Sequence, residues 1–190
     1  MRVKDENKRQ AIRDATVLEV VKGGLSSASI AKIANRAGLS QGTIYLYFPS
    51  KERLLQDVYL EIKRDIHARM MSANDASVGS AEHIKSLWFL LLEYAVEHPN
   101  DFAFSELLSA AQLLEDAQIS ELEVMSTDIR VSIDMAVADG TLIDAPVQSI
   151  MSVLTSPAIQ AARSVALQGK PLDKAKIERT FDLIWRGIAK

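Results

Sequence analysis

The amino-acid sequence predicts an all-α protein, and three observations lead to that prediction. Apolar residues recur every three or four positions through most of the 190 residues, which is the spacing of one helix face. No segment combines strict alternation of apolar and polar residues with clustered β-branched side chains, as a half-buried strand does. Glycine, proline and small polar residues interrupt the helical pattern and divide it into about nine helices.

The predicted helices are short near the amino terminus and longer afterwards. They cover residues 6–21, 29–37, 41–48, 51–71, 81–97, 101–114, 118–139, 145–168 and 172–189. The segment from Ser72 to Ser80 is small and polar and is predicted to be a surface loop. Pro157 is expected to kink or split its helix because proline removes a backbone donor.

The charge distribution divides the chain into two parts. Residues 1–64 hold 12 Lys/Arg against 7 Asp/Glu, a net charge of +5, whereas residues 65–190 hold 10 against 18, a net charge of −8. A basic part can bind phosphates, because their neutralisation releases counterions. We predict an amino-terminal domain over residues 1–50 and a helical carboxy-terminal domain over residues 51–190.

Composition excludes several classes of protein. With 48% hydrophobic residues the chain is too apolar to be disordered, and without cysteine it holds no disulfide or thiolate metal site. Met1 to Gln10 lacks the apolar stretch of a signal peptide, so a cytoplasmic protein is expected. His67, His83 and His98 lack the spacing of a helical metal site. Because no phosphate loop or nucleophile motif appears either, we expect no cofactor and no enzymatic activity.

The segment from Ser29 to Phe48 predicts two short helices joined by a tight turn. Ser29 and Ser40 are placed to cap the two helices, and Gly38 supplies the left-handed conformation that ends the first one. Ile44 and Phe48, four residues apart, are expected to point inward. Helices joined this closely cross steeply, as in a helix-turn-helix, although an ordinary α-hairpin has the same spacing.

The residues on the outer face of the second short helix are typical of a surface that binds a partner. Gln41, Gly42, Thr43, Leu46 and Tyr47 are expected there, and none of them is charged. Small residues at its start allow close approach, while the amide and hydroxyl groups can bind phosphates or base edges.

The segment from Ile33 to Leu54, IANRAGLSQGTIYLYFPSKERL, resembles the signature of the tetracycline-repressor-like (TetR) family. That signature runs approximately Ile-Ala-x-x-Ala-Gly-(Val/Leu)-Ser-x-Gly-Thr-(Leu/Ile)-Tyr-x-(Tyr/His)-Phe-x-Ser-Lys-Glu-x-Leu. The resemblance covers residues 8–66 closely, and less specifically the segments 94–99 and 183–188. It implies a three-helix DNA-binding domain containing the helix-turn-helix, followed by a helical ligand-binding and dimerisation domain.

The resemblance also implies roles for individual residues. Residues at positions that face base edges are Gln41, Gly42, Tyr45 and Leu46. Residues at phosphate-binding positions are Thr43, Tyr47 and Lys51, with Ser29 as a further phosphate contact at a helix amino terminus. Many family members place a polar residue where this chain has Ala31, so the first short helix is expected to read fewer bases.

Two apolar sets belong to the expected second domain. The candidate ligand-pocket residues are Trp88, Leu91, Leu92, Phe102, Phe104, Leu108, Met125, Ile129 and Met151, although residues at such spacing are more often core. The candidate dimer-interface residues are Ala158, Ala161, Ala162, Val165, Ile177, Phe181, Ile184, Trp185 and Ile188.

The functional hypothesis is therefore a homodimeric repressor that binds a palindromic operator in double-stranded DNA. A small apolar or amphipathic molecule of unknown identity would release it, and no membrane association is expected. Two alternatives stay open: a DNA-binding regulator controlled by a partner protein, and an all-α ligand carrier that does not bind DNA. Salt-dependent binding to a palindrome separates the first two hypotheses from the third.

Overall fold

The computed structural model describes residues 2–72, 78–168 and 173–190, leaving aside the side chains of residues 2–4, 110, 162 and 166–168. Within these residues the chain forms nine α-helices and no sheet, which confirms the all-α prediction. The helices are α1 (Arg2–Gly23), α2 (Ile30–Ala37), α3 (Gln41–Tyr47), α4 (Lys51–Met71), α5 (Ser80–Glu97), α6 (Pro99–Ala111), α7 (Asp116–Ala138), α8 (Val147–Gln168) and α9 (Lys174–Ile188).

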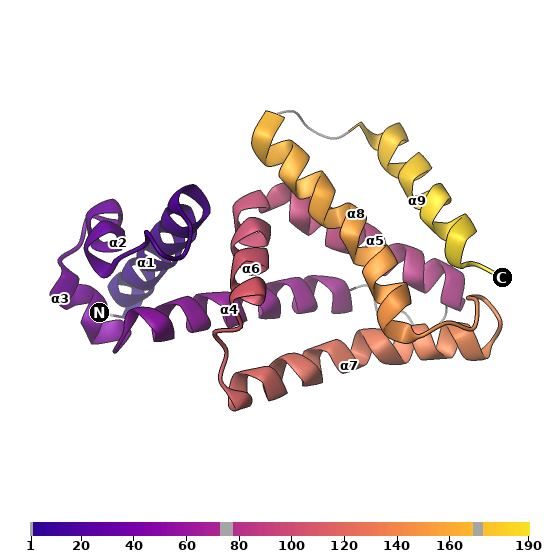
Figure 1. Ribbon diagram of the computed structural model, residues 1–190, viewed down its shortest axis with the longest axis horizontal. Helices are drawn as coiled ribbons and strands as arrows, with labels where there is room; N and C mark the ends of the chain where they lie inside the picture. The colour runs from indigo at the N-terminus through magenta and orange to yellow at the C-terminus, as the bar shows by residue number, and fades with distance from the viewer. Residues whose placement is uncertain (1, 73–77, 169–172) are drawn as a thin grey trace.

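A small amino-terminal module occupies one end of the molecule. Helices α1 to α3 pack against each other and against the start of α4, which runs from this module under α6 toward the other helices (Figure 1). Ile12, Ile33, Ile44 and Phe48 are fully buried in its core. Phe104 and Leu108 of α6 join the same core, so the module is packed directly onto the rest of the chain.

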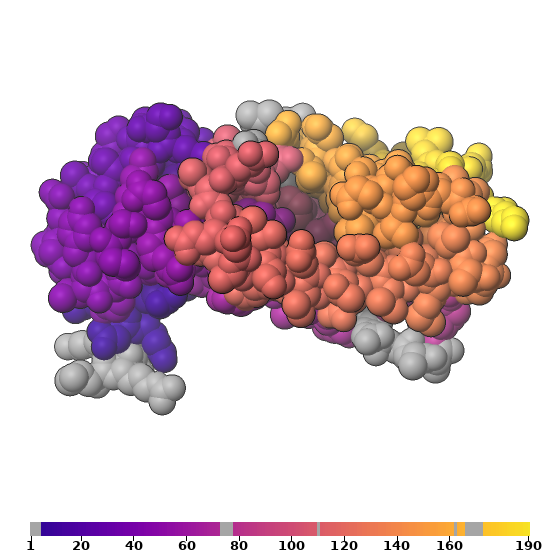
Figure 2. Space-filling model, turned by 60° about the horizontal axis from the view of Figure 1, so that its bottom comes forward, coloured from indigo at the N-terminus to yellow at the C-terminus, as the bar shows by residue number. Residues whose placement is uncertain are grey.

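The second core lies among α5, α7, α8 and α9. Its largest contributors are aromatic: the rings of Trp88 and Phe181 lie 5.2 Å apart, and those of Phe181 and Trp185 lie 5.6 Å apart. The end of α9 is fastened to the segment after α7 by the backbone bond from the N–H of Ile143 to the carbonyl of Ile188, at 2.9 Å. Helix α7 runs along the face of the molecule that Figure 2 shows, which it shares with the amino-terminal module and α8.

Most helix boundaries agree with the prediction within two residues; α1, which begins at Arg2 and not at residue 6, and α6 differ by more. The predicted helix 101–114 begins earlier, at Pro99, because proline suits a first helical turn, and it ends at Ala111 because Gln112 adopts φ 51°. Pro157 does not split α8, which continues through it. Most of the predicted loop from Ser72 to Ser80 lies outside the described residues. Among the helices described, none combines the length and apolar character needed to cross a bilayer.

Candidate nucleic-acid interface

The turn between α2 and α3 is built from local capping interactions that the sequence predicts. The Ser29 hydroxyl accepts a hydrogen bond from the Lys32 backbone N–H at 3.3 Å, and the Ser40 hydroxyl accepts one from the Thr43 N–H at 3.1 Å. Gly38 adopts φ 67°, a conformation that costs other residues roughly 1–2 kcal/mol. These two capping hydrogen bonds and the left-handed conformation of Gly38 define the turn that leads into α3.

Helix α3 has one buried and one exposed face. Ile44 and Phe48 are 0% and 2% exposed, which confirms their predicted inward orientation. Gln41 and Gly42 are exposed, as are Tyr45 at 53% and Leu46 at 84%. All four residues predicted to face bases therefore lie on the accessible side of one short helix.

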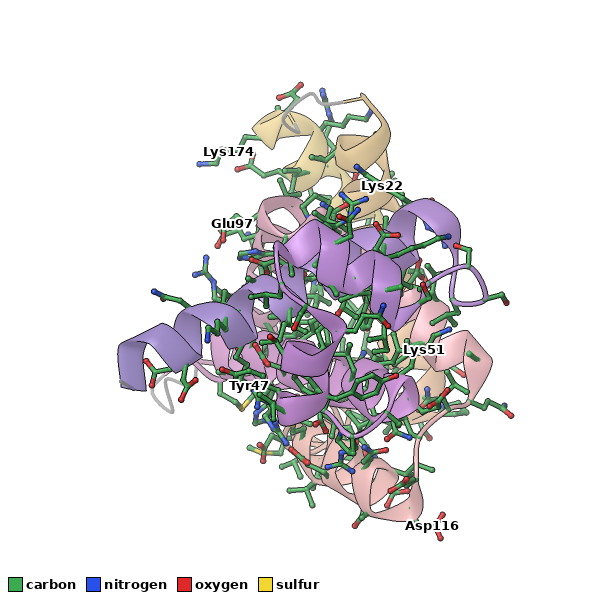
Figure 3. All side chains as sticks on the ribbon, turned by 90° about the vertical axis from the view of Figure 1, so that its left-hand side faces the viewer. Lys22, Tyr47, Lys51, Glu97, Asp116 and Lys174 are labelled. Carbon is green, nitrogen blue, oxygen red and sulfur yellow. The ribbon has the colours of Figure 1, made fainter. Side chains whose placement is uncertain are left out.

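The residues predicted to bind phosphates all have hydrogen-bond partners within the chain, and Ser29 is already engaged in the cap of α2. The Tyr47 hydroxyl donates to the Asp5 carboxylate at 2.6 Å, and the Lys51 ammonium donates to the Leu25 carbonyl at 2.9 Å. The Thr43 hydroxyl shares a hydrogen bond with that of Ser40 at 2.9 Å. Figure 3 views the molecule from this end, where Tyr47 and Lys51 are labelled.

Asp5 is a participant that sequence reasoning missed. It lies on the first turns of α1, which begin at Arg2 and not at Glu6 as predicted, and this extension brings the carboxylate to Tyr47. The hydrogen bond to Asp5 raises the pKa of the Tyr47 hydroxyl above its ordinary value. The contact joins residues 42 positions apart, so helical spacing could not reveal it.

Arg13 is the second missed residue, and it connects the module to the helices behind it. From α1 its guanidinium forms ion pairs with Asp101 of α6 at 2.8 Å and with Glu61 of α4 at 3.0 Å. Burial acts to lower the pKa of this guanidinium, but the hydrogen bond and charge of Asp101 outweigh burial and raise it. The arginine thus stays charged and holds three helices together.

The Arg13 ion pairs line a polar cleft of about 470 Å³ between α1, α4 and the α5–α6 junction. Tyr94 lies in the same cleft, and its pKa is raised by burial and then by the charges of Asp101 and Asp65. Despite these carboxylates, no group of three metal-ligating side chains occurs in the described part of the chain.

The candidate ligand-pocket residues divide between the two cores. Phe104 and Leu108 belong to the core beneath the module, whereas Trp88, Leu91, Leu92 and Phe102 belong to the second. Ile129 and Met151 pack against the second core, and Met125 is half-buried on α7. Trp88 and Leu92 line a cavity that measures about 280 Å³ and opens between α5, α8 and α9.

The candidate dimer residues are also divided. Ala158, Phe181 and Ile188 are buried within the chain itself and are thus unavailable to a second copy. The half-buried members are Ala161, Val165, Ile177, Ile184 and Trp185, and the side chain of Ala162 lies outside the described part. A partner chain would have to contact the half-buried group.

Comparison with known proteins connects this arrangement to a family. The family model described as bacterial regulatory proteins, tetR family, matches residues 12–58. The regulator BetI, an HTH-type transcriptional regulator of Paraburkholderia phymatum, is 38% identical over 63 residues, which are 33% of this chain and 32% of that protein. The nucleoid occlusion factor SlmA of Vibrio vulnificus is 31% identical over 98 residues, 50% of each chain. The matches thus span about a third to a half of the length of these relatives.

Solved structures resemble the chain over nearly its full length. A TetR family transcription regulator from Marinobacter aquaeolei has a TM-score of 0.89 at 24% identity and covers 100% of both chains. One from Shewanella sp. PV-4, described as putative, has a TM-score of 0.80 at 25% identity and covers 96% of this chain and 98% of its own. The fold is thus an amino-terminal helix-turn-helix module, with the outer face of α3 exposed, followed by a helical carboxy-terminal part. Residues 12–58 match the tetR family of bacterial regulatory proteins, and the whole chain has the fold of solved structures described as TetR family regulators.

Proposed function

We propose that the protein is a dimeric transcriptional repressor that binds a palindromic operator through α3. The observation that carries this proposal is the outer face of α3, where Gln41, Tyr45 and Leu46 are exposed together. Leu46 is 84% exposed on a module whose other large apolar side chains are mostly packed. Thymine methyl groups in the major groove suit such a side chain, and the Gln41 amide suits adenine.

Phosphate contacts around this face would position the module on the duplex. Ser29, Thr43, Tyr47 and Lys51 supply hydroxyl and ammonium donors, and their present partners are an exposed carboxylate, a carbonyl and neighbouring hydroxyls and backbone groups. These donors can exchange their present partners for phosphate oxygens. Water can then solvate the partners that they leave, so no polar group loses its hydrogen bonds. The net positive charge of residues 1–64 supports the same role.

We further propose that a small molecule bound in the second domain lowers operator affinity. Helix α6 offers a physical connection: Glu106 pairs with Arg163 of α8 at 2.6 Å, and Asp101 pairs with Arg13 of α1. A displacement of α8 would therefore act on α1 through α6. Coupling between ligand and DNA of this kind is typically worth about 1–3 kcal/mol.

Control by a partner protein is the second candidate function. The match to SlmA, a nucleoid occlusion factor, covers more of the chain than the matches to BetI or to the fatty acid metabolism regulator protein of Bacillus subtilis. In that case DNA binding would persist while no small molecule altered it. The match of residues 12–58 to the tetR family model leaves little support for the third hypothesis, a ligand carrier that does not bind DNA.

The proposal is tested by titrating the full chain against duplex DNA from its own upstream intergenic region. We expect binding to one segment that weakens steeply as salt rises, because several phosphates are neutralised. Screening apolar and amphipathic compounds on that complex then separates the two functions. A compound that releases the DNA supports ligand control, and release by no compound favours partner control.

A further inference from the structure

We propose that the ligand site is the cavity between α5, α8 and α9, and that its ligand is a small amphipathic carboxylate. This inference rests on the proposed ligand-responsive function and specifies both its site and its chemistry. The cavity measures about 280 Å³. Small-molecule pockets start at roughly 300 Å³, so the ligand is the size of a one- or two-ring acid or a medium-chain fatty acid.

One side of the cavity presents apolar surface from α5. Trp88 and Leu92 line it there, and Trp88 is only 3% exposed. The indole N–H of Trp88 already donates to the carbonyl of Leu154 at 2.9 Å. Because its polar atom is satisfied, the indole offers the ligand only its apolar ring surface.

The other side carries polar groups from α8 and α9. Lys176 is the charged residue among those lining the cavity; its side chain is exposed, and the described part of the chain contains no ion pair of its ammonium. Gln160 adds an amide donor, whereas the Thr180 hydroxyl is engaged with the Lys176 carbonyl at 2.8 Å. An ammonium and an amide donor that line the same cavity favour an anionic group over a cationic one, and a carboxylate can accept hydrogen bonds from both.

The position of the cavity connects it to the proposed mechanism. Its walls include α8, which Arg163 joins to α6 and hence to the Arg13 ion pairs. Ala161 and Ile177 line the cavity and also belong to the candidate dimer surface. A ligand there would lie beside the second chain, where small shifts of α8 or α9 change the separation of two DNA-binding modules.

Calorimetric titration of the full chain with 2-naphthoate tests the site, with 2-naphthylmethylamine as the cationic probe of matched ring. We expect the acid to bind and the amine to bind much more weakly. Lys176→Gln should weaken acid binding by about tenfold, because a charge-assisted hydrogen bond is lost. Lys176→Glu should weaken acid binding further and strengthen amine binding. Lys174 is exposed like Lys176 but does not line the cavity, so Lys174→Gln should leave both affinities unchanged.

Three results would overturn the inference: no acid binding at millimolar concentration, equal binding of acid and amine, or equal losses from Lys176→Gln and Lys174→Gln. Measuring operator affinity in parallel distinguishes a failure of this ligand site from a failure of the proposed function. If the acid binds through Lys176 but operator affinity does not change, the site is supported and ligand control is contradicted. If a ligand still releases the DNA equally well from the Lys176→Gln variant, ligand control is supported but this site is wrong.

Discussion

Lys51 and Gln41 are expected to contribute different kinds of DNA contact. Lys51 can exchange its bond with the Leu25 carbonyl for a phosphate, whereas Gln41 is exposed at the start of α3 without charge. Lys51→Ala should weaken binding to all duplexes and reduce the salt slope by about one contact. Gln41→Ala should change the preference among operator variants by about 1–3 kcal/mol. Binding isotherms on an operator series check both, and equal, sequence-independent losses would contradict the division.

Asp5 is expected to weaken DNA binding. Its carboxylate holds the Tyr47 hydroxyl and places a negative charge beside a predicted phosphate position. Asp5→Asn should therefore raise operator affinity at low salt by about threefold, an effect that salt reduces because the charge is exposed. In a Tyr47→Phe background most of that gain should disappear. An unchanged or lower affinity for Asp5→Asn would show that the contact does not compete with phosphate.

Residue-scale features were predictable from sequence where their partners are local. Ser29 and Ser40 cap backbone groups three positions away, and Gly38 ends a helix through its own conformation. The Asp5–Tyr47 and Arg13–Asp101 contacts join residues 42 and 88 positions apart, and only the packed fold brings them together. A charged residue at a buried position of a helix such as α1 is the one sequence cue that could have pointed to Arg13.

At the scale of elements, the contact of α1 with α6 is expected to depend on Asp101. Its side chain and that of Arg13 are only 11% and 10% exposed, so the remaining charge would be poorly solvated if one partner were neutralised. Asp101→Asn should lower the free energy of unfolding by about 2 kcal/mol, measured in denaturant. The control Arg163→Gln removes the more exposed pair with Glu106 and should cost less than about 1 kcal/mol. Equal losses would contradict a special role for Arg13.

Helix positions followed from the periodicity of apolar residues, but their packing partners did not. Predicted and observed bounds of α4 are both Lys51–Met71, because Ser50 caps its start and the small polar segment follows its end. The spacing of Phe104 and Leu108 identified a buried face of α6, yet not that this face joins the core beneath the DNA-binding module. Likewise, the stripe of α9 predicted a buried surface without showing that Phe181 packs on Trp88 of the same chain.

For the whole molecule, the remaining half-buried surface of α8 and α9 is predicted to hold a second copy. Val165→Glu combined with Ile184→Glu places charge on both helices while leaving the buried Phe181 intact. We expect the wild type to be dimeric at micromolar concentration and the double variant to be monomeric, because unpaired charges in an interface are costly. Mass measured by light scattering checks this, with helicity as the control for folding. A folded variant that stays dimeric would place the interface elsewhere.

The central claim is that two copies of α3 read one palindrome. Selection of bound duplexes from a random DNA library by the full chain tests it most directly, since no operator need be known. The account predicts an enriched inverted repeat whose half-sites lie about one helical turn, or a multiple of it, apart. Enrichment of a single asymmetric site, or of none at any salt concentration, would contradict it.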